Sequence, residues 1–266
     1  MKKILLGVAS FVALSSSAFA ADLYKGSLKD APVYEAPAIW TGLYVGAHGG
    51  YAWDSIDFPG TPSHANGGAP RPDLEGGFVG GQIGYNYQFD KIVVGVVADI
   101  SAANLEKTER DGNYLNETTS IDKFGTVRAI LGYSFGKVLP YATVGYGWTS
   151  LSYKFGCPDA LITGGYGGCN TKPSWSPVTT PSANRTSGFD ATTGGLVYGG
   201  GVKYAIDNRF SIGVEYLRFD KADETADYAA YAYFPASKTK IETETDTVKL
   251  SVDYKVFGGS IYEPLK

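Results

Sequence analysis

Eight stretches of the chain alternate apolar and polar residues with a period of two, the pattern of half-buried β-strands. The clearest stretch places Val79, Ile83 and Tyr85 on one face. Gln82 and Asn86 lie between them and fall on the other face. The other stretches show the same alternation, except that the two faces of the stretch at residues 139–154 are ambiguous. We therefore expect an all-β chain with one apolar and one polar sheet surface.

The connections between these stretches alternate between long and short. In bacterial outer-membrane β-barrels, long loops lie outside the cell and tight turns lie in the periplasm. The long connections are expected at residues 54–74, 104–118, 155–189 and 221–239, and the short ones at Asp90, near Gly136 and at Asp207–Asn208. This alternation of long and short connections predicts an eight-stranded antiparallel up-and-down transmembrane β-barrel over residues 40–257, with four long extracellular loops and short periplasmic turns.

The positions of the aromatic residues separate a membrane barrel from a globular β-sandwich, which would show the same alternation. Two aromatic belts are expected where the strands meet the lipid headgroups. The residues near the short turns are Tyr87, Phe89, Tyr133, Phe135, Tyr204, Phe210 and Tyr254, and those toward the long loops are Tyr51, Trp53, Tyr146, Trp148 and Tyr216. These two groups predict an aromatic girdle at each end of the barrel.

The two ends of the chain lie outside the predicted barrel. Lys2 and Lys3 precede an apolar run and then small residues up to Ala20, which is the pattern of a cleaved secretory signal peptide over residues 1–20. Its apolar core is well short of the roughly 20 residues that a membrane-spanning helix needs. Residues 21–39 are expected to form a Pro-containing periplasmic leader, and residues 258–266 a C-terminal tail. The predicted location is the cell outer membrane.

Composition excludes a nucleic-acid partner and supports a single barrel domain. The formal net charge is −4, whereas a nucleic-acid-binding domain would carry a basic patch. The 266 residues include 35 glycines, well above the usual share of about 7 %. A barrel of this length is commonly one domain.

The number of strands predicts that the lumen is largely filled, because an eight-stranded barrel is only wide enough for its own side chains. Buried charges persist only when they are paired and hydrogen-bonded. The charged residues expected to point inward are Asp99, Arg128, Lys203, Glu215, Lys249 and Asp253. We therefore predict a lumenal ion-pair network centred on Arg128 and Glu215, with a proton or ion relay as the functional alternative.

Several short motifs resemble the small outer-membrane β-barrel surface proteins of alphaproteobacteria. The motifs are Trp40–Gly46, Gly125–Arg128, Leu131–Tyr133, Leu139–Ala142, Glu215–Leu217 and Thr247–Lys249. This family is similar to the eight-stranded OmpA transmembrane domain, and its members are called porin-family, opacity-type or, in some cases, haemin-binding proteins. The resemblance implies an abundant structural or surface-exposed barrel without an enzymatic role.

The resemblance also implies partners. They are outer-membrane lipid and lipopolysaccharide, the barrel assembly machinery, and host or surface ligands at the loops. Barrels of this kind commonly end on an aromatic residue that the assembly machinery reads, whereas here Phe257 is followed by a tail to Lys266. The assembly signal is therefore expected to be internal.

The two cysteines, Cys157 and Cys169, lie in the third long loop of an exported chain. In an oxidising compartment such a pair is most simply a disulfide that closes the loop. A metal or redox site is the alternative, and it lacks a second pair of ligands and a nearby histidine.

The residues leave three hypotheses for function. We expect no enzyme, no cofactor and no metal, because the chain has only two histidines, His48 and His64, and catalytic barrels need histidine groups gathered at the outer rim. A structural surface barrel comes first, and a porin or narrow diffusion channel for small solutes second. The third is a haemin or other small-ligand receptor, whose candidate axial ligands are His64, Tyr228, Tyr231 and Tyr233.

Overall fold

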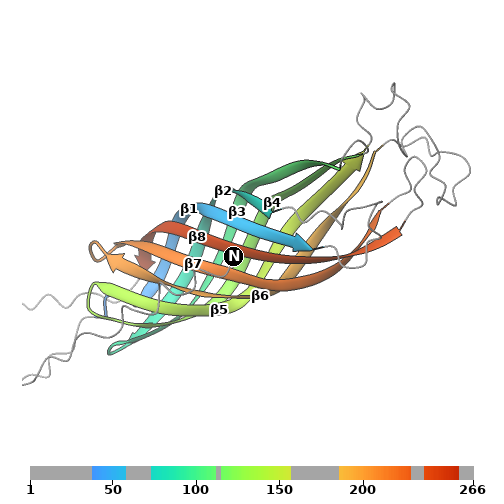
Figure 1. Cartoon of the computed structure of the whole chain (residues 1–266). Coiled ribbons are helices and arrows are strands. Elements are labelled where there is room, and N and C mark those ends of the chain that lie inside the picture. Colours follow the sequence, from blue (N-terminus) through green and yellow to red (C-terminus); the bar gives the residue numbers. More distant parts are fainter. Residues whose placement is uncertain (1–37, 58–72, 112–114, 157–185, 229–236, 258–266) are drawn as a thin grey trace, which may run out of the picture. The chain divides into compact units, whose positions relative to one another are not determined.

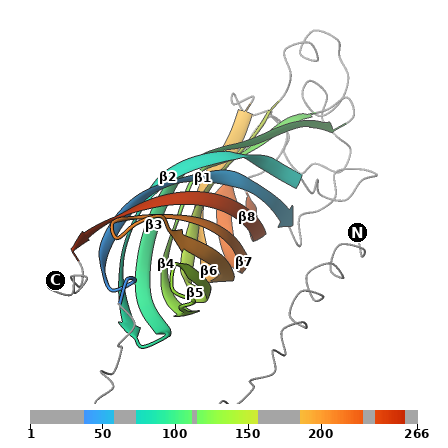
Figure 2. The ribbon, with the colours of Figure 1, turned by 90° about the vertical axis from the view of Figure 1, so that its left-hand side faces the viewer.

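The computed structural model describes residues 38–57, 73–111, 115–156, 186–228 and 237–257. Eight strands make up almost all of this part, and each pairs with its sequence neighbours in one closed barrel. The strands are β1 (Gly42–Asp57), β2 (Asp73–Phe89), β3 (Ile92–Asp111), β4 (Leu115–Tyr133), β5 (Val138–Gly156), β6 (Thr186–Ala205), β7 (Phe210–Tyr228) and β8 (Ser237–Phe257). Figures 1 and 2 show the strands running obliquely around the barrel wall. The predicted fold class is confirmed.

All eight strand pairs are antiparallel, and β8 closes the barrel by pairing with β1. In this last pair Val45 lies opposite Tyr254 and Tyr51 opposite Val248. Closure satisfies the backbone N–H and C=O groups along the wall, which hydrocarbon could not do. No helix in the described residues is long and apolar enough to cross a membrane.

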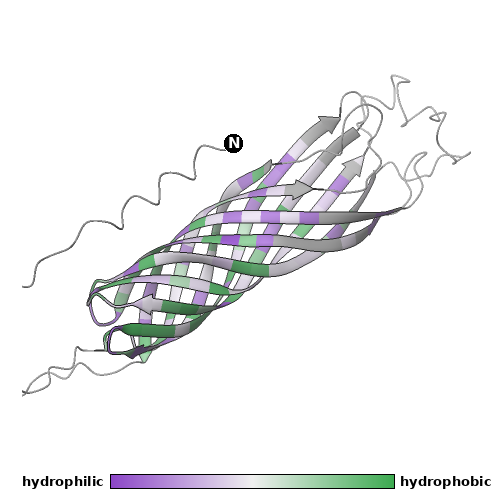
Figure 3. Cartoon of the chain, turned by 60° about the horizontal axis from the view of Figure 1, so that its bottom comes forward, coloured by the Kyte–Doolittle hydropathy of each residue, from purple (hydrophilic) through white to green (hydrophobic). Residues whose placement is uncertain are grey.

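The two faces of the wall differ as the period-two pattern predicts, and Figure 3 shows the alternation as green and purple bands along the strands. The side chains of Val79 and Leu250 point outward and are 67 % and 64 % exposed, whereas inward-facing Arg128 is 2 % exposed. The outer surface is therefore apolar and lipid-facing, and the polar side chains fill the interior. The faces of β5, which the sequence leaves ambiguous, are resolved: Tyr141 and Thr143 point inward.

Several strands extend further than the sequence predicts. Residues 104–111 and 115–118, expected in a long loop, continue β3 and β4, and residues 221–228 continue β7. These predicted loop boundaries are wrong because β-bulges interrupt the alternation there, between Ala102 and Leu105 and between Phe219 and Ala222. Trp40, expected to begin the first strand, precedes β1 instead.

The lumen is filled in layers from the short turns toward the long connections. The layer next to the short turns consists of Trp40, Val93, Leu139 and Ala205. The next layer consists of Tyr44, Val97, Ile130 and Tyr141. The charged residues follow, and beyond them lies an apolar cluster of Ala52, Leu74, Phe78, Leu105, Ile121, Phe124, Leu151, Val197, Leu217 and Phe219. We call the part of the lumen from the short turns up to and including the charged layer the polar half. The part beyond it is the apolar half, although it also contains buried polar side chains such as Asp54 and Thr245, which hydrogen-bond each other.

Candidate functional site

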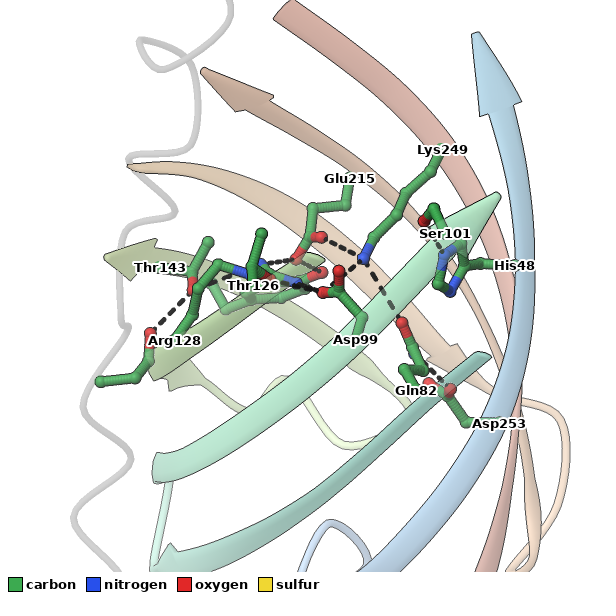
Figure 4. Close-up of polar contacts among 12 residues, drawn as sticks. His48, Gln82, Asp99, Ser101, Thr126, Arg128, Thr143, Glu215, Lys249 and Asp253 are labelled. Carbon is green, nitrogen blue, oxygen red and sulfur yellow. Dashed lines mark hydrogen bonds and ion pairs between the residues drawn. The ribbon is translucent and has the colours of Figure 1, made fainter. Parts of the chain in front are cut away.

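The centre of the polar half is the Arg128 guanidinium on β4, shown in Figure 4. Its Nη2 lies 2.7 Å from Oδ2 of Asp99 on β3, and its Nη1 lies 2.9 Å from Oε2 of Glu215 on β7. Its Nε donates a hydrogen bond of 2.8 Å to Oγ1 of Thr126, which in turn donates one of 2.7 Å to Asp99 Oδ2. The guanidinium is thus held on three sides across the lumen.

Lys249 on β8 provides a second cation to the same two carboxylates (Figure 4). Its Nζ lies 2.9 Å from Glu215 Oε1, at ion-pair distance but outside hydrogen-bond geometry, and 3.4 Å from Asp99 Oδ2. The hydroxyl of Tyr141 donates a hydrogen bond of 2.8 Å to Glu215 Oε2. Each carboxylate therefore faces two cations, which offsets much of the cost of its burial.

A second ion pair joins Lys203 on β6 to Asp253 on β8, with Nζ 2.7 Å from Oδ2. The Lys203 ammonium also lies 4.2 Å from the centre of the Tyr44 ring, a cation–π contact. Gln82 connects the two groups of charges, because its Nε2 donates to Asp253 Oδ1 at 2.5 Å and its Oε1 accepts from Lys249 at 3.4 Å. A Cβ at Gly46 would overlap Asp253 Oδ1, so only glycine fits there.

All six charged residues predicted to point inward lie in this network, and all are buried. Three are cations and three are anions, so the network carries no net charge. Its members come from β3, β4, β6, β7 and β8, and Gln82 adds β2. The network thus crosslinks most of the barrel wall. This arrangement can resist passage of ions, because a permeating ion would have to displace a paired side chain.

The sequence analysis placed Gln82 on the polar face of its strand, but it did not predict that Gln82, Tyr141 and His48 take part in or border this network. Gln82 and Tyr141 both take part in the network, and His48 lies beside it with Nε2 2.8 Å from Ser101 Oγ. The ring of His48 packs edge-on against Phe78, with 6.1 Å between ring centres. Each of these residues is an even number of positions from another inward-facing residue of its strand, and this spacing is the signal that places it in the lumen.

The apolar half of the lumen is closed by interlocking aromatic rings. Phe124 packs edge-on against Phe78 and Phe219, with 5.0 Å and 5.8 Å between ring centres. Tyr153 and Phe189 are partly buried and pack against the same cluster. Edge-to-face pairs of this kind are a favoured packing of aromatic rings and fill this part of the lumen.

Trp40 covers part of the end of the barrel near the short turns. Its backbone N–H donates to Gln88 Oε1 at 3.1 Å, and its Nε1 donates to the Gly136 carbonyl at 3.0 Å. Lys255 Nζ holds the neighbouring Ile39 carbonyl at 2.7 Å. In the adjacent turn, the backbone N–H groups of Phe210 and then Arg209 hold the pKa of the Asp207 carboxyl below its ordinary value.

Most of the predicted aromatic girdle points outward at the two expected levels. Ten members are exposed, namely Tyr51, Trp53, Tyr87, Phe89, Tyr133, Phe135, Tyr146, Tyr204, Phe210 and Tyr216. Trp148 and Tyr254 are half-buried. Trp148 lies over Gly125, where a Cβ would overlap its ring.

The remaining candidates fall outside the described residues. They are the predicted haemin ligands His64, Tyr231 and Tyr233 and the predicted disulfide partners Cys157 and Cys169. Tyr228 is the last residue of β7.

A closed antiparallel barrel with an apolar exterior and a filled lumen defines the class of outer-membrane β-barrels. The family model for the outer membrane protein beta-barrel domain matches residues 6–255. The chain belongs to this family and is an outer-membrane protein.

Known relatives come from Brucella. The 31 kDa outer-membrane immunogenic protein of Brucella melitensis is 31 % identical over 234 residues, covering 83 % of this chain and 87 % of the relative. The 25 kDa outer-membrane immunogenic protein of Brucella abortus is 30 % identical over 163 residues, covering 60 % of this chain and 70 % of the relative. These matches agree with the resemblance to alphaproteobacterial surface barrels.

Solved structures of other outer-membrane proteins match this chain at low sequence identity and with TM-scores below 0.5. OprG of Pseudomonas aeruginosa is 15 % identical with a TM-score of 0.40, covering 81 % of this chain and 97 % of its own. Ail of Yersinia pestis is 14 % identical with a TM-score of 0.38, covering 80 % of this chain and 99 % of its own.

Proposed function

We propose that this protein is a closed, non-catalytic surface barrel that contributes to envelope integrity and acts through its outer surface rather than by transport through the lumen. The observation that carries the proposal is the double filling of the lumen. A paired charge network occupies one half, and packed aromatic and aliphatic side chains occupy the other.

Closure follows from the energetics of both halves. A solute that crossed the polar half would have to break the Arg128 ion pairs, and orphaned buried charges cost about 3–5 kcal/mol. A hydrated ion in the apolar half would lose water against Phe78, Phe124 and Phe219, and the polar groups buried there are engaged with one another, Thr245 with Asp54 and Thr193 with Thr243.

Contacts with lipopolysaccharide form part of the proposal. Outward-facing charges begin beyond the outer aromatic belt, where lipid phosphates would lie. Lys123 is exposed on β4, and Arg218 on β7 forms ion pairs with Glu244 and Asp246. Lys123 has no ion-pair partner among the residues that the structure describes, and a lysine at this level suits a phosphate group. We expect Lys123→Gln to reduce the extra thermal stability that lipopolysaccharide gives over phospholipid, and Lys91→Gln at the opposite end to leave it unchanged.

Single-channel conductance in a planar lipid bilayer tests the closed state. We expect no stable stepwise openings from protein whose folding is proved by a heat-dependent gel shift. Stepwise openings in most insertions would overturn the proposal and favour the narrow diffusion channel.

A matched pair of variants tests what closes the lumen. A variant that combines Phe124→Ala, Phe219→Ala and Arg128→Ser lacks two lumenal rings and the central guanidinium. We expect it to show stepwise channel openings in the bilayer. Leu250→Ala, which trims a lipid-facing side chain, should remain silent.

A further inference from the structure

A narrow cavity of about 30 Å³ opens at the periplasmic end of the barrel and reaches the charged layer. It passes Trp40 and ends among Tyr44, Asn86, Lys203 and Asp253. A water molecule or a monatomic ion needs roughly 10–15 Å³ of such space. The cavity can therefore hold one or two small occupants.

The donors around this cavity are more numerous than its free acceptors. Arg209 and Lys255 line it, and no carboxylate among the described residues lies within ion-pair distance of either. Lys255 Nζ donates to the Ile39 carbonyl, and Arg209 Nη1 donates to the Tyr254 hydroxyl at 2.9 Å. Because an ammonium has three donors and a guanidinium five, both cations keep unused N–H groups.

The two carboxylates of the cavity are already engaged. Asp253 accepts from Lys203 and Gln82 with its two oxygens. Asp207 accepts two backbone N–H bonds of 2.7 Å, from Arg209 and Phe210, at its Oδ1, and its charge also interacts with the Arg209 guanidinium. Three cations against two engaged anions give the cavity a positive excess, which disfavours a metal cation as its occupant.

Two residues that line the inner end of the cavity, Tyr44 and Asn86, each carry a buried polar atom without a hydrogen-bond partner within the described residues, and these atoms lie over Gly84 and Gly95 of the barrel wall. Tyr44 is 6 % exposed and its hydroxyl makes no hydrogen bond within the described residues. Asn86 is 3 % exposed and its Oδ1 is likewise without a partner. Buried polar groups are nearly always satisfied, by an ion or water if not by protein. The Tyr44 hydroxyl can donate to an occupant, and Asn86 can do so through its amide NH₂ when the side chain is turned over.

We propose that this cavity is a small-anion site open to the periplasm, with Arg209 and Lys255 at its entrance and the Tyr44 hydroxyl and Lys203 at its inner end. A halide-sized anion fits its volume. The ligand is either a free inorganic anion or the carboxylate end of a larger periplasmic molecule. Such a site would act on the periplasmic side only, since the charged layer and the apolar cluster close the lumen beyond it.

Trp40 lines the cavity and provides a reporter. Iodide quenches tryptophan fluorescence on contact, so a variant with Trp53, Trp148 and Trp175 changed to Phe reports on Trp40 alone. We titrate this variant with iodide at constant ionic strength, in detergent and with folding verified by the gel shift. We expect saturable quenching that chloride reverses by competition. Quenching that stays linear in iodide, unaffected by chloride, would overturn the proposal.

Charge and hydroxyl variants identify the donors. Arg209→Gln and Lys255→Gln should each weaken iodide binding about tenfold, as expected for one lost charge-assisted hydrogen bond. Tyr44→Phe keeps the ring under Lys203 and should weaken binding less. Lys91→Gln, which removes a cation from the neighbouring hollow at the same end, is the matched control and should change nothing. An equal loss in this control would mean general electrostatic attraction and would refute a defined site.

Acetate as a competitor separates the two sources of the anion. Displacement of iodide by acetate at concentrations comparable to chloride supports a carboxylate end as ligand. Displacement by chloride alone supports a free inorganic anion.

Discussion

The two halves of the lumen are filled by different interactions. In the half near the short turns, Arg128 and Lys249 share the carboxylates of Asp99 and Glu215. In the half near the long connections, Phe124 packs edge-on between the rings of Phe78 and Phe219. Both halves are built from inward-facing residues of the same strands.

The difference lies in what each half demands of its residues. The polar half needs partners at hydrogen-bond distance, because a single missing group leaves a charge unpaired in a dry interior. The apolar half needs only volume and shape, because hydrophobic contacts are non-directional. In the polar half, the loss of any one partner should therefore cause a large loss of stability. In the apolar half, the loss of stability should grow with the side-chain volume that is removed.

The largest effect is expected from Arg128→Ala. It leaves Asp99 and Glu215 without their shared guanidinium and should lower the free energy of unfolding by about 3–5 kcal/mol. Urea unfolding of the protein in lipid vesicles measures this. Arg209→Ala, at the exposed end of the barrel, should stay within about 0.5 kcal/mol of the parent. Unchanged stability of Arg128→Ala would show that the network stabilises nothing.

In the apolar half, Leu217→Ala should lower the free energy of unfolding by about 3 kcal/mol, because it removes buried apolar surface and leaves a cavity. Unlike the change at Arg128, this loss should not vary with salt concentration. Leu250→Ala is the control, because it shortens a leucine side chain that lies on the lipid-facing surface and is 64 % exposed. Equal losses at both positions would mean that the lumenal cluster is not packed as described.

The sequence predicts the wall of the barrel better than its filling. Period-two alternation assigns Arg128, Glu215 and Lys249 to the interior, because a one-residue shift would bring their charges into lipid. Their individual partners depend on strand register, which alternation does not give. The extent of the apolar half is harder still, because bulges such as that between Ile121 and Lys123 change the parity of the positions beyond them.

Trp40 shows a similar limit of sequence reading. An aromatic residue beside a Pro-containing segment gives no period, so it reads as the start of a strand or the end of a leader. Its position across the mouth depends on bonds to Gln88 and Gly136, residues far away in the sequence.

A smaller effect tests the directional character of the polar half. Tyr141→Phe removes only the hydroxyl that donates to Glu215, and should cost about 1.5–2 kcal/mol, the value of a hydrogen bond to a charged group. Tyr198→Phe on the outer surface, where the ring is 40 % exposed, should have little effect. The comparison of the two halves would fail if both hydroxyls proved equally dispensable.

The smallest effect is expected outside the lumen, at Asp207. Its folded-state pKa is lowered by the N–H groups of Phe210 and Arg209, so its carboxylate stabilises the turn above the unfolded pKa of about 4. This contribution should disappear as the pH falls through the folded-state value. The difference in urea midpoint between the parent and Asp207→Ala should therefore shrink on acidification. Asp207→Asn retains an oxygen acceptor that does not titrate, so its difference from Asp207→Ala should persist at low pH. A parent-to-alanine difference that stays constant with pH would show that the charge of Asp207 contributes nothing and that the turn, unlike the polar lumen, depends on shape alone.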